Sequence, residues 1–267
     1  MSRIKGCFAR LEAEGRKALI PYITAGYPQK DYTVNLMLEM VAAGVDVIEL
    51  GVPFSDPGAD GPVIQAAHQR GVSQGVTLAD VLAMVSEFRK TDNDTPIALM
   101  TYLNPVEIMG YEQFAQTAAE AGVDGLLVVD SPPEHSAELL KALGRYELDA
   151  IYLLAPTTPD DRVRRICEAA SGYVYYVSLK GVTGAATLDV DGVRERVAQI
   201  KTITQLPVCV GFGIHNGDTA AAISQVADGV IVGTALVKTL AAEATPALGS
   251  QAVKQQLAEM RSRMDAC

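Results

Sequence analysis

The 267-residue chain has no tryptophan, three histidines and four cysteines. The cysteines form no C-x-x-C pair and match no other metal-ligand spacing, and the histidines lie far apart along the chain. Cysteines scattered in this way are typical of reduced thiols in a cytoplasmic protein. We therefore expect no disulfide framework and no metal site.

Long hydrophobic runs and an excess of positive charge are also missing. No apolar stretch approaches the ~18–20 residues that a membrane span needs, and the N-terminus lacks the apolar segment of a signal peptide. With 32 acidic against 22 basic residues the formal net charge is −10, which argues against binding to nucleic acid. We expect a cytoplasmic protein that binds neither membrane nor nucleic acid. An anionic substrate would need a local electropositive trap, because the overall field repels it.

Short apolar, β-branched runs recur along the chain, and each is followed by a segment with helical periodicity. The runs predict strands at residues 18–25, 45–51, 96–102, 123–130, 148–155, 173–178, 206–211 and 228–233. Eight strands alternating with helices predict a parallel sheet, and eight is the number that closes a barrel. We therefore expect residues 1–267 to form one α/β domain, a (β/α)8 TIM barrel, with an extra helix before residue 18 and a final helix from Pro246 onward. An open doubly wound sheet is the main alternative, but no G-x-G-x-x-G motif follows the first strand.

A weak internal repeat accompanies these strands. Residues 43–48, 121–126 and 227–231 each place Gly or Asp where a helix ends and a buried strand begins. The repeat indicates duplication of one βα unit, although such turns also arise by chance in α/β proteins.

Glu49 is the first residue that could carry chemistry. Strand alternation puts it on one face with Val45 and Val47, while Ile48 and Leu50 take the other face. If Ile48 and Leu50 meet the helices, Glu49 points into the barrel near its C-terminal mouth. A carboxylate there is costly to bury unless it is paired or functional. A structural glutamate paired with Lys or Arg is the alternative, and no strand offers an obvious partner.

The loop over residues 53–62 contains three prolines and two glycines, so it can present carboxylates over the barrel mouth. Asp60 is the candidate, although just before Gly61 and Pro62 it could equally cap a helix. Asp56 could belong to an Asx turn. A metal site made from Asp56 and Asp60 is only weakly indicated.

Glycines follow the last three strands. Residues 178–185 predict a mobile lid that ends in a backbone anion nest. Gly211 and Gly213 follow the seventh strand, and Gly233 precedes a helix that begins near Thr234. Backbone amides and a helix N-terminus at these loops bind phosphate in many (β/α)8 enzymes, and they attract an anion without a basic surface.

Inward positions on the other strands are apolar or aromatic, and most such residues are core. The upper ones, with Ile64 and Phe212, could line a slot for a flat apolar ring. The predicted inward residues are Tyr22, Met100, Leu127, Val129, Leu153 and Tyr175.

At this point the sequence closely resembles the tryptophan synthase alpha chain family, essentially from end to end. The resemblance is carried by residues 47–57 (VIELGVPFSDP), 59–65 (ADGPVIQ), 181–184 (GVTG), 211–214 (GFGI) and 233–235 (GTA). It implies cleavage of indole-3-glycerol phosphate into indole and glyceraldehyde 3-phosphate, with Glu49 and Asp60 as the catalytic pair.

The resemblance also implies the remaining roles. Tyr175 and Thr183 are expected to help assemble and close the site. A pyridoxal-phosphate-dependent beta chain is the expected partner in an alpha2-beta2 assembly, so no cofactor is expected in this chain. Phosphate contacts are expected at Gly184, Gly213, Gly233 and Thr234, and the partner interface near Pro53, Asp56, Asn104 and Pro105.

Two departures from the family pattern stand out. Thr234 replaces a more familiar serine, which should leave a backbone phosphate contact intact, and residues 179–180 differ in the predicted lid. A Schiff-base aldolase that uses Lys180 is one alternative, but a lysine in a Gly-containing loop would be exposed and protonated. A subunit that only activates a partner enzyme is the other.

Overall fold

The structure is a computed structural model that describes residues 2–178, 189–211 and 213–267. In this part of the chain eight parallel strands close into a barrel in sequence order, and β1 pairs with both β2 and β8. The predicted TIM barrel is therefore confirmed, and the open doubly wound alternative is excluded. The strands are β1 (Ala18–Thr24), β2 (Ile48–Gly51), β3 (Ile97–Thr101), β4 (Gly125–Val128), β5 (Asp149–Leu154), β6 (Val174–Val177), β7 (Val208–Gly211) and β8 (Gly229–Val232).

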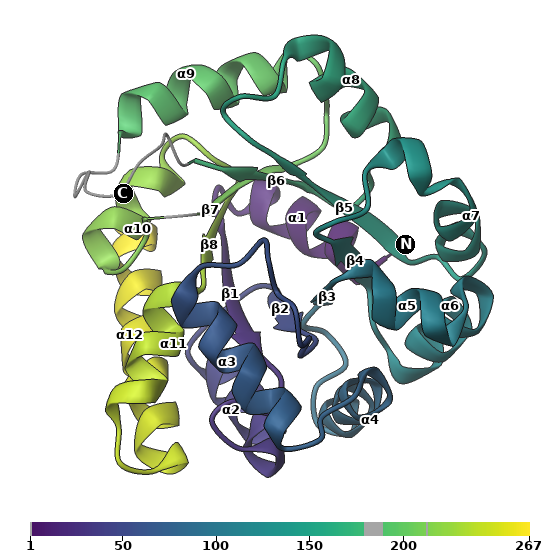
Figure 1. Ribbon diagram of the computed structural model, residues 1–267. Coiled ribbons are helices and arrows are strands. Elements are labelled where there is room, and N and C mark those ends of the chain that lie inside the picture. Colours follow the sequence, from purple (N-terminus) through teal and green to yellow (C-terminus); the bar gives the residue numbers. More distant parts are fainter. Residues whose placement is uncertain (1, 179–188, 212) are drawn as a thin grey trace.

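Helices cover the strands, with α1 across one end of the barrel and the others in an outer ring (Figure 1). In the described residues they are α1 (Arg3–Ala13), α2 (Thr33–Ala42), α3 (Pro62–Ser73), α4 (Leu78–Arg89), α5 (Leu103–Met109), α6 (Tyr111–Ala121), α7 (Ala137–Arg145), α8 (Asp160–Ala169), α9 (Val190–Lys201), α10 (Gly217–Ser224), α11 (Thr234–Ala242) and α12 (Pro246–Asp265), with the short 3-10 turns η1 (Lys30–Tyr32) and η2 (Pro133–His135). No described helix is long and apolar enough to cross a membrane.

Helix α1 closes the end of the barrel at which the strands begin. Ser2 caps the helix by accepting from the Lys5 N–H. Its buried face, which includes Ile4 and Phe8, packs into the apolar cluster inside the barrel, where the Phe8 and Tyr173 rings lie 5.8 Å apart. The predicted N-terminal covering helix is confirmed, and the predicted final helix is α12. With this end plugged, the other end of the barrel remains for a site.

β1 begins at the predicted residue, and the other seven strands start later than the sequence predicts, most clearly β2, which begins at Ile48 rather than residue 45. Val47 and Glu49 face inward as expected. Val45 does not share that face. It precedes the strand and packs in the large outer cluster together with Ile48 and Leu50, because the turn from α2 rotates the chain before alternation begins.

The three repeated segments share one contact. Asp46, Asp124 and Asp228 each lie in the turn before an even-numbered strand, and each carboxylate accepts the backbone N–H of a residue at the start of the strand before it. The acceptor distances are 2.9, 2.8 and 2.9 Å, to the amides of β1, β3 and β7. An ionised carboxylate makes a strong bond with such an amide. These carboxylates therefore latch neighbouring strands together where the barrel begins.

Each of these three carboxylates also forms an ion pair with a basic side chain. Asp46 contacts Arg261 of α12 at 3.1 Å, and Asp228 contacts Lys201 at 2.7 Å. Asp124 contacts Arg89 at 2.8 Å. The Arg89 guanidinium also donates to the carbonyls of Gly122 and Thr95, so this buried group is held on several sides.

The buried Arg89–Asp124 pair should be a main contributor to stability. Replacing Arg89 with Met (Arg89→Met) leaves a buried carboxylate whose remaining described partners are the Ile97 N–H and the partly exposed Arg3. The free energy of unfolding, measured with urea at pH 7, should therefore fall by about 3 kcal/mol relative to the wild type. Lys90→Met is the control, because the Lys90–Glu87 pair is exposed and such pairs contribute less than about 1 kcal/mol. Equal losses for the two variants would contradict this role of the pair.

Candidate active site

Glu49 lies on β2 inside the barrel with 1% of its surface exposed. The Tyr173 hydroxyl donates to Glu49 Oε1 at 2.6 Å. Oε2 is buried and has no hydrogen-bond partner among the described residues. In the described structure Glu49 is therefore not a structural glutamate paired with Lys or Arg, because the partner of its carboxyl is the Tyr173 phenol. One oxygen remains available for chemistry.

Burial raises the pKa of Glu49 to about 7, while the hydrogen bond from Tyr173 lowers it. Desolvation dominates because an ionised carboxylate in an apolar interior loses its hydration. At neutral pH the group is therefore divided between its acid and base forms, which is the condition that favours proton transfer in both directions.

Asp60 lies in the loop between β2 and α3, and it does not cap α3. Gly61 is the N-cap residue, and no side-chain cap is present. The Asp60 carboxylate accepts instead from the Tyr102 hydroxyl at 2.7 Å, and that hydroxyl accepts from the Ala59 N–H at 3.0 Å. Tyr102 thus fixes both the position of the β2–α3 loop and the orientation of the Asp60 carboxylate. The helix-cap interpretation of Asp60 is wrong.

Tyr22 connects the neighbourhoods of the two carboxyls. It pairs in register with Glu49 across β1 and β2, and its hydroxyl lies 3.3 Å from Nε2 of His68, which itself lies 3.5 Å from Asp60 Oδ2. Gly51 makes room for this arrangement, because a Cβ there would meet the Tyr22 hydroxyl at 2.3 Å. The structure therefore brings Glu49, Tyr22 and Asp60 to one mouth of the barrel.

The predicted pocket residues form a continuous apolar wall. Tyr22 and Ile64 belong to one buried cluster, Leu127 belongs to the inner barrel cluster, and Met100 packs against both. Tyr175 packs against the inner cluster, over Gly211, where a Cβ would lie 2.3 Å from its hydroxyl. Thr183 and Phe212 lie outside the described residues.

Two of the predicted phosphate positions can be placed at the same mouth. Gly233 precedes α11 as its N-cap, next to the Tyr22 ring, and exposed Thr234 is the first residue of that helix. The carbonyl of Gly233 accepts from Leu236 and Val237, so the amides of the two residues before them point out of the helix N-terminus. Gly213 adopts a positive φ of 76° after β7. Gly184 and Lys180 lie outside the described residues.

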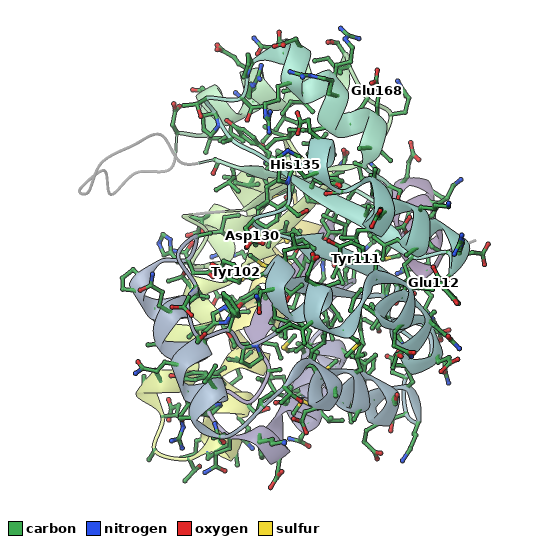
Figure 2. The ribbon with its side chains drawn as sticks, turned by 45° about the vertical axis from the view of Figure 1, so that its right-hand side comes forward. Tyr102, Tyr111, Glu112, Asp130, His135 and Glu168 are labelled. Carbon is green, nitrogen blue, oxygen red and sulfur yellow. The ribbon has the colours of Figure 1, made fainter. Side chains whose placement is uncertain are left out.

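The residues expected at a partner interface are distributed over the loop after β2 and the first turn of α5, which touch each other. The Phe54 and Tyr102 rings stack at 4.8 Å, which joins the loop after β2 to the start of α5. Asp56 and Asn104 are exposed there and Pro105 is half-buried, whereas Pro53 is buried beneath α3, against Gly71. Figure 2 shows Tyr102 and Asp130 on the same side of the barrel, and the Leu103 N–H donates to Asp130.

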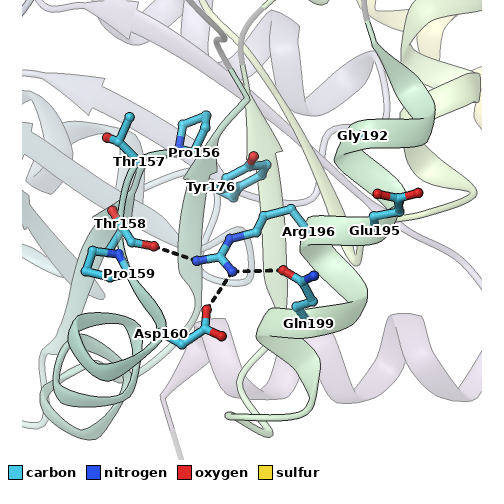
Figure 3. Close-up of a pocket in the computed structure, with 10 residues that line it drawn as sticks. All are labelled: Pro156, Thr157, Thr158, Pro159, Asp160, Tyr176, Gly192, Glu195, Arg196 and Gln199. Carbon is cyan, nitrogen blue, oxygen red and sulfur yellow. Dashed lines mark hydrogen bonds and ion pairs between the residues drawn. The ribbon is translucent and has the colours of Figure 1, made fainter.

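A separate hollow of about 490 Å³ lies between α9 and the loop after β5. Its lining contains none of the predicted site residues (Figure 3). Arg196 spans it by donating to the Thr158 carbonyl, to Asp160 and to Gln199. The terminal nitrogens of Arg196 are therefore already engaged by protein acceptors across this hollow.

Comparison with known proteins decides the family. The family model described as tryptophan synthase alpha chain matches residues 8–266. The chain belongs to the tryptophan synthase alpha chain family. It is 60% identical over 266 residues to the tryptophan synthase alpha chain of Thioalkalivibrio sulfidiphilus, with 99% of this chain and 100% of the relative covered. The corresponding protein of Marinobacter nauticus is 57% identical, with 99% and 98% covered.

Solved structures agree with this assignment. Tryptophan synthase subunit alpha from Legionella pneumophila str. Paris superposes with a TM-score of 0.91 at 44% identity, and each chain is covered completely. A chain of tryptophan synthase from M. tuberculosis, in its aminoacrylate-bound form, gives a TM-score of 0.88 at 35% identity, with 99% and 100% covered. As an alpha chain, the protein is a lyase of tryptophan biosynthesis that cleaves indole-3-glycerol phosphate to indole and glyceraldehyde 3-phosphate.

Three polar site residues escaped the sequence analysis: Tyr173, Tyr102 and His68. Tyr173 shares the alternation of Tyr175 and could have been found from it. His68 lies four residues after Ile64 on the buried face of α3, so helical spacing places it under the loop. Nothing in the local pattern of Tyr102 indicates its contact with Asp60, which depends on how the loop folds back.

The hydrogen bond from the Tyr173 hydroxyl should lower the pKa of Glu49. In Tyr173→Phe the donor that favours the carboxylate is lost, so the pKa of Glu49 should rise above about 7. Carbon-13 NMR of the glutamate side-chain carboxyl, followed against pH in both proteins, measures this shift. Tyr176→Phe is the matched control on the outer face of the same strand. A Glu49 pKa that stays the same or falls in Tyr173→Phe would contradict the interpretation.

Proposed function

We propose that Glu49 and Asp60 perform the cleavage of indole-3-glycerol phosphate as an acid–base pair in one barrel domain. The observation that carries this proposal is the buried Glu49, whose pKa is about 7 and whose second oxygen is unpartnered in the described structure. Asp60 lies at the same mouth, held in place by Tyr102. The apolar wall formed by Tyr22, Ile64 and Met100 suits the flat indole ring.

The first step is protonation of the indole ring. Protonated Glu49 delivers its proton to C3, which converts indole to an indolenine whose nitrogen carries positive charge. Asp60, as an anion, accepts a hydrogen bond from the ring N–H and stabilises that charge. C3 can serve as a leaving group only after it has gained this proton.

The second step is the bond cleavage. Glu49, now ionised, removes the proton from the hydroxyl on the carbon attached to C3. The carbonyl of glyceraldehyde 3-phosphate forms, the carbon–carbon bond breaks, and its electron pair restores the neutral indole ring. Glu49 regains its proton, so the cycle balances. General acid–base help of this kind contributes about 10²–10⁴-fold to the rate.

The phosphate of the substrate is proposed to bind at backbone amides rather than at a basic surface. The outward amides at the start of α11, next to Gly233 and Thr234, and the turn at Gly213 support this seat. Gly184 is proposed to complete it, and Thr183, with Phe212 and Tyr175, to close the pocket. Main-chain donors resolve the conflict between an anionic substrate and a chain of net charge −10.

The chain is proposed to work in an alpha2-beta2 complex with a tryptophan synthase beta chain, in the cytoplasm. Pyridoxal phosphate would be held by the beta chain, and no cofactor is proposed for this one. Asp56 lies on the loop after β2, and Asn104 and Pro105 lie in the first turn of α5, which the Phe54–Tyr102 stack joins to that loop. Pro53 packs beneath α3, against Gly71. Close to them on α5, the large apolar side chain of Ile108 is 79% exposed, and the proposed interface would cover it.

Conservative changes to the carboxyls test the mechanism. Glu49→Gln and Asp60→Asn should each lower kcat for indole formation by at least about 100-fold, because the proton carrier or the stabilising anion is lost. The assay adds indole-3-glycerol phosphate to the isolated chain. A folded variant that retains near-normal cleavage removes that residue from the mechanism. A wild-type chain that forms no indole would favour a subunit that only activates its partner.

The same Glu49 variant has a predicted effect on stability. Because folding raises the pKa from 4.5 to about 7, Glu49 favours the folded state below pH 4.5, and this contribution is lost as the pH rises through 7. Glu49→Gln should therefore be more stable than the wild type at pH 8, by up to about 3 kcal/mol, with a smaller difference at pH 4. Thermal melts at both pH values also verify that the variant folds.

The exposed side chain of Ile108 tests the docking surface. Ile108→Asp should weaken binding to a tryptophan synthase beta chain by at least about tenfold, because a charge replaces an apolar contact. Leu248→Asp on α12 is the matched control, since that side chain is 47% exposed on a different part of the molecule. Isothermal titration of both variants with the beta chain makes the comparison. An equal loss of affinity, or none, would exclude α5 from the interface.

A further inference from the structure

His68 is a buried imidazole, 2% exposed, on the face of α3 that covers the loop between β2 and α3. Its ring contacts both ends of that loop. Nδ1 accepts the Phe54 N–H at 3.1 Å, near the beginning of the loop. Nε2 lies 3.5 Å from Oδ2 of Asp60, at its end, and 3.3 Å from the Tyr22 hydroxyl.

These contacts fix the tautomer of the ring. A backbone N–H can only donate, so Nδ1 must be unprotonated. Burial lowers the pKa of His68, against the opposing influence of Asp60, and this favours the neutral ring. The single ring proton is therefore on Nε2. It points toward Asp60 and Tyr22. The Tyr22 hydroxyl can accept it, because this hydroxyl can donate its own hydrogen bond to Thr24 Oγ1 at 3.1 Å.

The other groups around the ring leave this arrangement undisturbed. Tyr102 approaches with its ring at 79° to the imidazole, 6.3 Å between centroids, and donates its own hydroxyl proton to Asp60. Asp60 is the charged group that faces the imidazole in the described structure. The Tyr102 hydroxyl thus donates to Oδ2 of Asp60, and Nε2 of His68 lies 3.5 Å from the same oxygen, so among the described residues Oδ1 is left for a substrate N–H.

We propose that His68 is a positioning residue that holds the Asp60 carboxylate in its reactive orientation through Nε2–H, while Phe54 sets its tautomer. The proposal rests on the proposed role of Asp60. The imidazole does not touch the substrate, and it acts through the carboxylate that does. Contacts on two sides restrict the Asp60 carboxylate to its reactive orientation. The contribution of His68 should therefore appear in kcat rather than in KM.

Two substitutions of His68 distinguish the role of Nδ1 from the role of Nε2. In His68→Asn the side-chain oxygen can still accept from Phe54, but the donor toward Asp60 is lost. In His68→Gln the amide nitrogen can replace the Nε2–H donor, but the Phe54 acceptor is lost. His135→Asn, at an exposed histidine on η2 (Figure 2), is the control.

Steady-state cleavage of indole-3-glycerol phosphate by the isolated full-length chains gives the result. His68→Asn should lower kcat about tenfold and leave KM within about twofold, while His68→Gln should recover most of the rate. Equal kcat values for wild type and His68→Asn, or equal losses in both variants, would overturn the proposal. An inactive wild type would instead refute the proposed function.

A measurement on the wild type keeps the proposal testable even if the variants fail to fold. Nitrogen-15 NMR of the imidazole rings, with His68 assigned from its correlations, reports which ring nitrogen carries the proton. We expect protonated Nε2 and unprotonated Nδ1 at pH 7 to 8. Observation of the Nδ1–H tautomer, or of an imidazolium, would overturn the proposal independently of any activity.

Discussion

The whole structure accommodates one constraint, the burial of the Glu49 carboxyl within the barrel, which costs free energy of folding. A carboxyl with a single phenolic donor and an unpartnered second oxygen is tolerated only where the surrounding packing is firm. Helix α1 supplies that packing, because it closes the barrel below Glu49 and positions Phe8 against Tyr173. The near-neutral pKa of Glu49 is thus a consequence of how the barrel is closed at the opposite end from the reaction.

The proposed active site divides its tasks among groups of different kinds. In the proposed mechanism Glu49, in the barrel wall, carries the proton, and Asp60, on a loop supported by Tyr102, is the stabilising anion. The main chain provides positive potential at the start of α11, so the acidic chain does not need a cationic side chain to attract a phosphate. Glycines at 51 and 211 allow Tyr22 and Tyr175 to cross the strands closely. The groups come from the ends of several strands, which is the usual advantage of a (β/α)8 barrel.

The sequence predicted the eight strands, the terminal helices and the inward direction of Glu49, because these follow from alternation and periodicity. It did not predict the polar partners of the two carboxyls. Tyr173 is 124 residues from Glu49 and Tyr102 is 42 from Asp60, so their contacts arise from barrel closure and loop folding, which no local pattern records. The helix-cap interpretation of Asp60 was wrong for the same reason, since Tyr102 provides a better-directed donor than the first turn of α3. The catalytic, phosphate and interface roles stay predictions, and Gly184, Thr183 and Phe212 lie outside the described residues.

The aspartate latches at Asp46, Asp124 and Asp228 divide the barrel floor into pairs of strands, β1 with β2, β3 with β4 and β7 with β8. None of the three bonds spans the junction between β4 and β5, where the chain passes from the first half of the barrel to the second. Fragments separated at that junction would each retain their own latches, while fragments separated inside a pair would place donor and acceptor on different polypeptides. The arrangement therefore marks the junctions that no aspartate latch spans, such as the one between β4 and β5, as suitable places to divide or circularly permute the chain, and the latched pairs of βα units as its exchangeable parts.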